Sequence, residues 1–217
     1  MTQQPAVGHH FETLEQEHEA NKLGMWTFLA TEVLFFGGIF LCYFAYRYLY
    51  TQAFTEASQQ LYASIGTVNT VVLLTSSLTM ALAVHAIQQN QRRTVTLLLL
   101  ATAGLGALFL GIKAFEYYLD FREHLVPGWN YAPEGLTHAG QAELFFLLYF
   151  IMTGIHALHL TIGITIVTLV AWRVWRGHFS AQHYNGIENT GLYWHFVDVV
   201  WVFLYPMLYL VGHLGGG

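Results

Sequence analysis

Long apolar runs, separated by short polar stretches, dominate the chain from residue 23 onward. Five of these runs reach the roughly 20 residues that a helix needs to cross a bilayer. They cover about 23–50, 66–89, 94–119, 141–175 and 188–213. The connections are polar or rich in turn residues, as in QQNQRR at 88–93 and HLVPGWNYAPEG at 124–135. The pattern predicts an all-α fold, a polytopic membrane bundle of five transmembrane helices.

The segment before the first apolar run differs from the rest of the chain. Residues 1–22 are polar and carry several glutamates, whereas a signal peptide would begin with basic residues. We therefore predict two parts, a polar tail at 1–22 and a five-helix transmembrane domain at 23–217.

The basic residues predict the orientation of the bundle. Five of the eight would lie on the side of the N-terminus: Lys22, Arg92, Arg93, Arg173 and Arg176. The other three would lie at or near the opposite side: Arg47, Lys113 and Arg122. Because Lys and Arg accumulate in cytoplasmic loops, we expect the N-terminus in the cytoplasm and the C-terminus outside.

Composition supports a membrane protein and excludes several other classes. Of the 217 residues, 55% are hydrophobic and 10% are charged, against about 25% charged in soluble domains. The mean hydropathy is +0.44. The single cysteine, Cys42, can form neither an internal disulfide nor a paired-thiolate metal site. With only eight Lys and Arg, nucleic acid is not an expected partner.

One carboxylate lies deep inside the first apolar run. Glu32 comes ten residues after Lys22, about 15 Å along a helix. If Lys22 marks the membrane surface, Glu32 lies near the midplane, where an ionised carboxylate is costly. We therefore expect Glu32 to be protonated or closely paired.

Other polar residues are predicted at depth in the later helices. They are Asn69, Lys113, Glu116, His156, His159, His195 and Asp198. His156 and His159 are three residues apart, as are His195 and Asp198, so each pair should share a helix face. These residues are candidates for a buried polar site.

Three interpretations of this polar set compete. Imidazole and carboxylate groups could hold a metal or haem, but the Glu-x-x-His pattern of di-iron bundles is missing. Intramembrane carboxylates also mark proton or ion paths. The third interpretation is structural, with polar groups bonding across helices. No phosphate-binding loop, dinucleotide fingerprint or nucleophile elbow is visible, so the residues alone do not indicate a self-contained active site.

Two local features predict how the helices pack. Ala103, Ala107 and Gly111 recur every four residues, a spacing that lets helices approach closely in lipid. Pro206 removes a backbone donor from the last apolar run and should kink its helix.

Five motifs together resemble subunit III of the haem–copper respiratory oxidases. In chain order they are EVLFFGGIF from Glu32, NTVVLLTSS from Asn69, FEYY from Phe115, TGIHALHLTIG from Thr153 and YWHFVDVVWVFLY from Tyr193. Each predicted helix carries one of them, in the family's order. The resemblance covers about residues 23–213. Many family members have seven helices, and this chain looks like a shorter form without the first two.

The resemblance implies a non-catalytic subunit of a respiratory oxidase. Such a subunit flanks catalytic subunit I, which reduces oxygen to water and pumps protons, and subunit II belongs to the same complex. Subunit III stabilises the catalytic subunit and sustains its proton uptake. Haem and copper then belong to partner subunits, and we expect no catalytic, cofactor-binding or metal-ligating residue here. The expected location is the bacterial cytoplasmic membrane. Such a subunit can also belong to a larger respiratory supercomplex.

The resemblance also implies a lipid site. Family members hold phospholipids in a cleft between two helix groups, and Glu32 matches the family's membrane-embedded glutamate. The candidates for buried polar or lipid-cleft positions are Glu32, Asn69, Glu116, His156, His159, His195 and Asp198. We hypothesise that Glu32 is neutral at pH 7 and hydrogen-bonded to a group in 141–175 or 188–213. The alternative is an autonomous membrane metalloprotein or proton-coupled carrier that uses the buried His and Glu residues.

Overall fold

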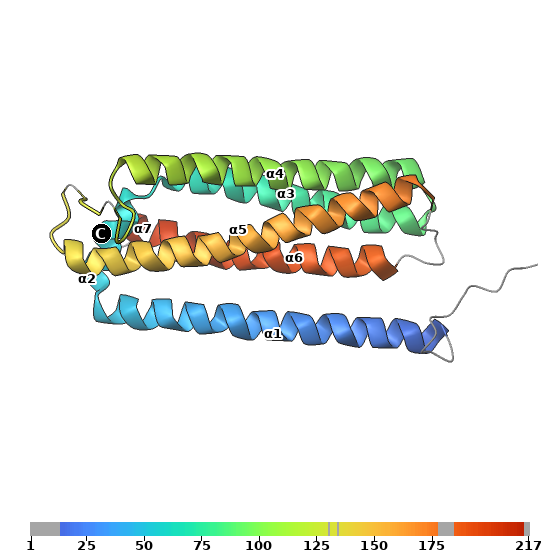
Figure 1. The fold of residues 1–217 in the computed structure, drawn as a ribbon, viewed down its shortest axis with the longest axis horizontal. Coiled ribbons are helices and arrows are strands. Elements are labelled where there is room, and N and C mark those ends of the chain that lie inside the picture. The colour runs from blue at the N-terminus through green and yellow to red at the C-terminus, as the bar shows by residue number, and fades with distance from the viewer. Residues whose placement is uncertain (1–13, 130, 134, 178–184, 215–217) are drawn as a thin grey trace, which may run out of the picture.

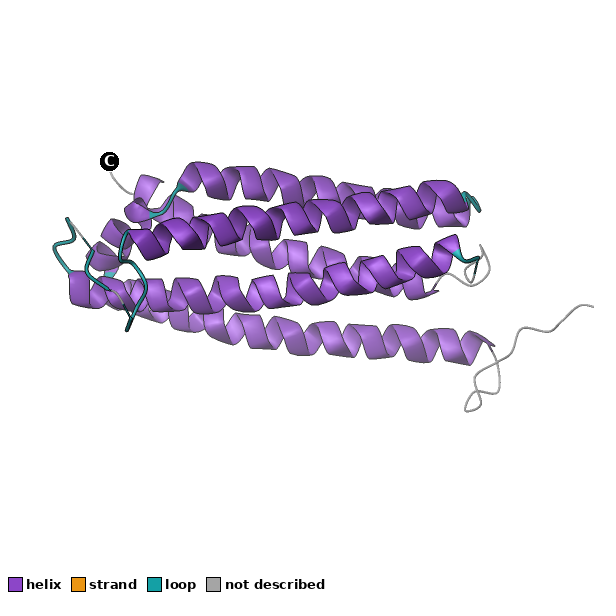
Figure 2. Cartoon of the chain, turned by 45° about the horizontal axis from the view of Figure 1, so that its top comes forward, coloured by secondary structure: helices purple, strands orange, loops and turns teal. Residues whose placement is uncertain are grey.

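The computed structural model describes residues 14–129, 131–133, 135–177 and 185–214, and in these residues it consists of helices joined by loops and turns, without a strand (Figure 2). The helices are α1 Leu14–Leu49, α2 Thr51–Gln60, α3 Ala63–Gln88, α4 Arg92–Arg122, α5 Ala139–Trp175, α6 Asn185–Tyr205 and α7 Val211–Leu214. A π-helical turn, η1, covers Pro206–Leu210 between α6 and α7.

Five of the described helices are long and apolar enough to cross a membrane, as predicted. Their spans are Glu19–Leu49, Ala63–Gln88, Arg92–Arg122, Ala139–Trp175 and Gly186–Leu210. Within a helix each backbone donor finds a partner in its own segment, which is the requirement for crossing lipid. One element was not predicted, the short α2 between the first two spans. The first helix begins at Leu14, within the predicted polar tail.

The helices form an elongated bundle with α1 along one edge (Figure 1). Helices α3 and α4 lie antiparallel, α5 packs on α4 and α6, and α6 packs on α3. Buried residues make up 56% of the most apolar stretch of the last span but only 17% of that in the first. Helix α6 therefore forms the centre of the bundle, and most of α1 is open to its surroundings.

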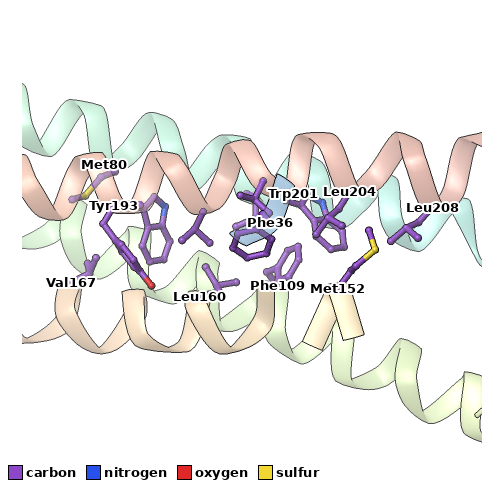
Figure 3. Close-up of a cluster of buried hydrophobic side chains, with 14 of the residues drawn as sticks. Phe36, Met80, Phe109, Met152, Leu160, Val167, Tyr193, Trp201, Leu204 and Leu208 are labelled. Atoms are coloured by element: carbon purple, nitrogen blue, oxygen red, sulfur yellow. The ribbon is translucent and has the colours of Figure 1, made fainter. Parts of the chain in front are cut away.

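Aromatic side chains fill the core between α4, α5 and α6. The rings of Phe109 and Trp201 meet edge to face, with centroids 4.7 Å apart. Met152 and Leu160 reach this cluster from α5 (Figure 3). Edge-to-face pairs add to the energy of burial, so this contact helps to hold α4 against α6.

Two indole groups attach α6 to α3. Trp194 Nε1 donates to Ser76 Oγ at 2.9 Å, and Trp201 Nε1 donates to Thr70 Oγ1 at 3.1 Å. A Cβ atom added at Gly106 would lie 2.8 Å from the Trp194 ring, so only glycine fits there. The ring of Trp194 on α6 is accommodated because α4 carries no side chain at Gly106.

The predicted small-residue stripe on α4 is wrong as a packing surface. Ala103 is buried, but Ala107 and Gly111 are exposed. The close approaches involve Gly106 of α4 and Gly163 of α5, which both contact the ring of Trp194. The spacing of small residues missed this contact because it depends on where the tryptophan of a third helix lies.

Pro206 begins a π-helical turn that frees backbone carbonyls near the end of the last span. Side chains of α1 and α2 bond to carbonyls in and just beyond this turn. Tyr43 OH donates to the Met207 carbonyl at 2.5 Å, and Ser58 Oγ donates to the Leu208 carbonyl at 2.7 Å. This is how a membrane helix tolerates a proline, and it ties α1 and α2 to the C-terminal segment.

Candidate functional site

The membrane-embedded carboxylate predicted at Glu32 is paired with one of the predicted histidines. Glu32 Oε2 of α1 lies 3.1 Å from His159 Nε2 of α5. The two side chains are 18% and 16% exposed, so the pair is neither solvated nor fully enclosed. Phe36 packs against the imidazole edge to face at 5.2 Å. The sequence predicted a partner for Glu32 in one of two helices, and the structure gives it one in α5.

The hydrogen bonds of His159 limit where protons can be. Its Nδ1 lies 2.9 Å from the Ile155 carbonyl, which can only accept, so Nδ1 carries a proton. An ionised Glu32 facing an unprotonated Nε2 would place two acceptors 3.1 Å apart. Two arrangements supply a donor and keep the pair neutral, namely a neutral acid with a neutral imidazole, or a carboxylate with an imidazolium. A neutral acid facing an imidazolium would leave a net positive charge, which burial away from water disfavours.

A cleft of about 480 Å³ opens beside this pair. Its walls come from α1, α5 and α6, and its lining residues are Met25, Phe28, Glu32, His159, Ile162, Ile166, Asn189, Thr190 and Tyr193. Tyr193 OH donates to the His159 carbonyl at 2.9 Å, which fixes one wall. Apolar side chains thus surround a small polar centre, the usual composition of a ligand cleft.

A second polar site is a fully buried network around Lys113. Its ammonium lies 3.1 Å from Glu116 Oε2, 2.9 Å from Tyr149 OH and 2.5 Å from Tyr209 OH. It also lies 4.5 Å from the centre of the Tyr149 ring. The network joins α4, α5 and η1, since each of the three contributes a side chain to it.

Counting donors indicates one further proton in this network. Tyr149 OH lies 3.0 Å from both Glu116 Oε1 and Asp120 Oδ2, yet it has only one proton to donate. Tyr209 OH donates to Glu116 Oε1 at 2.6 Å. Every contact is satisfied if Asp120 is protonated and donates to the Tyr149 oxygen. The network is then neutral overall, as burial away from water favours.

The predicted pair of His156 and His159 is split between two environments. His156 is fully buried, with ring centroids 5.1 Å from Trp201 and 5.6 Å from Phe109. Neither of its nitrogens meets a hydrogen-bond partner among the residues that the structure describes. His159 instead lies beside the cleft. The i, i+3 spacing was therefore a poor guide to which residues act together.

His195 and Asp198 of α6 are both neighbours of Ser77 on α3. Ser77 Oγ lies 2.7 Å from His195 Nδ1. Ser77 is also a polar neighbour of Asp198, although neither carboxyl oxygen meets a partner at hydrogen-bonding geometry in the described chain. Asn69 is likewise buried, and its amide meets no partner there. These side chains lie in the α3–α6 interface, apart from the cleft.

Three members of the Lys113 network were missed as a group by the sequence analysis. Asp120, Tyr149 and Tyr209 were not selected, although Lys113 and Glu116 were. The signal for Asp120 was present, because positions 113, 116 and 120 lie on one face of a helix. The tyrosines carried no such signal, since aromatic residues are common throughout this chain.

The described residues bring no three His, Cys, Asp or Glu side chains together in an arrangement that could hold a metal ion. The predicted residues instead form a carboxyl–imidazole pair at a cleft, a buried lysine network and a polar helix interface. The lysine network is fully buried, whereas the Glu32–His159 pair lies beside a cleft and His195 and Ser77 are partly exposed.

Comparison with protein families gives a match over nearly the whole chain. The family described as cytochrome c oxidase subunit III matches residues 2–121 and 129–213. The matching range includes α1, α3, α4, α5 and α6, and with them Glu32, His159 and the Lys113 network.

Individual relatives carry the same description. The cytochrome c oxidase subunit 3 of Thermostichus vulcanus is 34% identical over 191 residues, covering 87% of this chain and 86% of the relative. That of Synechocystis sp. is 32% identical over 207 residues, covering 95% and 80%. The subunit 3 of Neotragus moschatus is also 32% identical, over 211 residues, covering 94% and 74%.

Proposed function

The chain belongs to the cytochrome c oxidase subunit III family, and from this premise we propose that it stabilises the oxidase's catalytic subunit and sustains its proton uptake. It is a multi-pass membrane subunit of an oxidase complex. Catalytic subunit I and subunit II are its partners. Haem and copper belong to those partners, and this chain contributes no redox centre.

The single observation that carries this proposal is the contact of Glu32 with His159 at 3.1 Å beside an open cleft. In either neutral arrangement of the pair, one proton is held at a depth where an unpaired charge would be costly. A group of this kind can keep a proton available close to a partner without taking part in oxygen chemistry. The Lys113 network serves a different purpose, since it joins three elements in the interior.

The cleft beside Glu32 holds phospholipid in this proposal. Its wall residues Met25, Phe28, Ile162 and Ile166 are apolar and suit acyl chains, while Glu32 and His159 provide a small polar centre. Helix α1 touches the rest of the bundle mainly through α6, so an occupant of the cleft would support it.

The proposed location is the bacterial cytoplasmic membrane, with the N-terminus inside. The start of α4 and the end of α5 lie at the same end of the bundle as the start of α1 (Figure 1). That end carries Arg92, Arg93, Arg173 and Arg176, in accord with the accumulation of basic residues on the cytoplasmic side.

The direct test removes this chain from the purified oxidase while haem and copper stay in place. We expect the initial rate of oxygen reduction to remain within about twofold, because no reacting group is lost. The activity should then decay severalfold faster per turnover, and more so at high pH, where protons are scarce. If the initial activity vanishes with the metal centres intact, the supporting role is wrong.

Co-purification in a mild detergent tests the assembly itself. We expect a haem-containing subunit and a copper-binding subunit to accompany the tagged chain. A chain that comes out alone and carries metal would instead support the autonomous metalloprotein, which the family match does not favour.

A further inference from the structure

A second and larger cleft lies between the first turns of α4 and the last turns of α5. Its volume is about 890 Å³, and it shares no lining residue with the cleft beside Glu32. Leu97 and Leu100 form one wall, and Trp172 and Trp175 form the other. All four are exposed in the chain, at 47 to 72% of their full surface. Four large, exposed apolar side chains in one cleft indicate a surface that an apolar ligand or partner covers.

The depth of this cleft corresponds to one leaflet of a bilayer. From Arg92 to Leu100 is eight residues, about 12 Å along α4. Half of a hydrocarbon core is roughly 15 Å thick. The cleft therefore runs from the end of the helices to a point near the middle of the membrane.

Positive charge gathers at the mouth of the cleft. Arg92 and Arg93 line it directly, and Arg176 lies with its guanidinium 4.5 Å from the centre of the Trp172 ring. The sequence contains no Asp or Glu in 88–100 or 165–177. Neither lining arginine forms an ion pair or a side-chain hydrogen bond with any residue that the structure describes. This end of the cleft therefore suits an anion.

The deeper part of the cleft offers little polar chemistry. Its two threonine hydroxyls already donate within their own helices, Thr96 to the Arg92 carbonyl at 3.0 Å and Thr168 to the Ile164 carbonyl at 2.7 Å. Aromatic residues with indole N–H groups lie near the end of α5, at the level where such rings gather at membrane interfaces. The cleft is thus polar and cationic at its mouth and apolar further in.

We propose that this cleft binds one anionic phospholipid. The phosphate lies against Arg92 and Arg93, where planar guanidinium groups can bind it through paired hydrogen bonds. An acyl chain lies along Leu97 and Leu100 toward the membrane centre. A soluble anion would use only the mouth, whereas the apolar wall lies within the membrane span and is adjacent to lipid in any case. The inference goes beyond the proposed function, since it requires only that α4 and α5 cross a membrane.

The test is native mass spectrometry of the intact oxidase complex, with the number of retained phospholipids as the readout. Two variants alter the cleft in different ways. Arg92→Gln with Arg93→Gln removes the charge at the mouth, and Leu100→Trp fills the apolar wall while the arginines remain. Arg122→Gln is the matched control, because it removes an exposed arginine at the other end of α4. Haem content confirms that each complex is assembled.

We expect both cleft variants to lose one anionic phospholipid per complex and the control to keep it. After the lipid has been stripped with detergent, added phosphatidylglycerol should restore it in the wild type and the control but not in the cleft variants, and phosphatidylcholine should restore it in none. An unchanged lipid count in both cleft variants would overturn the proposal. So would the loss of a protein subunit in place of a lipid, because the cleft would then be a protein interface.

Discussion

Charged side chains are placed inside the membrane in two different ways in this chain. Lys113 and its partners are fully buried and join α4, α5 and η1 through several hydrogen bonds. Glu32 and His159 form a single contact beside an open cleft, and α1 has few other buried residues. Both groups reach neutrality, one through a network and the other through one shared proton.

The difference separates a structural role from a functional one. Removing Lys113 or Glu116 leaves the other as a buried, unpaired charge, so the effect of the change should appear in folding and assembly. Removing Glu32 leaves a partner that the cleft can still accommodate, so its effect should appear in turnover.

Replacing Lys113 with methionine should be the most damaging single change. Glu116 would keep its burial and its tyrosine donors but lose its only cation, and breaking such a buried pair costs about 3–5 kcal/mol. We expect little assembled subunit, measured as the amount of this chain that co-purifies with the oxidase.

The matched variant replaces both members of the pair, as Lys113→Met with Glu116→Gln. No uncompensated charge remains, so assembly should recover most of the loss. If the double variant assembles no better than Lys113→Met, the ion pair is not the reason for the defect.

Two glycine substitutions test whether the interior of the bundle is packed more tightly than α1. At Gly106 a Cβ would lie 2.8 Å from the Trp194 ring, so Gly106→Ala should cost about 1–3 kcal/mol through overpacking. Gly37→Ala on α1 meets no atom within 4 Å, so it should be neutral or slightly stabilising. Thermal unfolding of the complex measures both, and an equal loss at the two sites would contradict the described packing.

Glu32→Gln should leave folding nearly unchanged, by less than about 1 kcal/mol, because a neutral amide can still donate to His159 Nε2. It should shorten the turnover lifetime of the oxidase severalfold, most clearly at high pH. The readout is oxygen consumption followed to inactivation. Glu19→Gln, which alters an exposed carboxylate in the first turns of α1, is the control. A normal lifetime in Glu32→Gln would remove the functional role of the pair.

The smallest effect concerns a carboxylate outside the membrane spans. Burial is the largest single influence on the pKa of Glu56 and raises it, but the interactions with His138 and with the Thr137 amide at 3.1 Å together outweigh it, so the pKa lies below the usual 4.5. A lowered pKa stabilises the fold above pH 4.5, and this is lost as the pH falls through the folded-state value. Glu56→Gln should therefore be less stable than the wild type at pH 7 and equal to it well below pH 4.5, in thermal unfolding at each pH.

The sequence predicted the spans well and the side-chain partnerships poorly, for a physical reason. Apolar length alone determines a membrane span, so all five were located within a few residues of their ends. Partnerships depend on helix rotation and on third helices, which local spacing does not contain. Glu32 was expected to find a polar partner, and it did, but nothing in the sequence distinguished His159 from His156. Likewise Gly106 acts through Trp194, a residue 88 positions away.

The most direct test of the account is where the shared proton lies in the Glu32–His159 pair. A charged pair would have to desolvate two groups in a poorly solvated cleft, whereas the neutral pair keeps the same hydrogen bond at lower cost. We therefore predict that the proton lies on Glu32. Infrared difference spectra at pH 7 of the wild-type complex against Glu32→Gln should show a protonated-acid band that the variant lacks. A carboxylate band without a protonated-acid band would contradict the account.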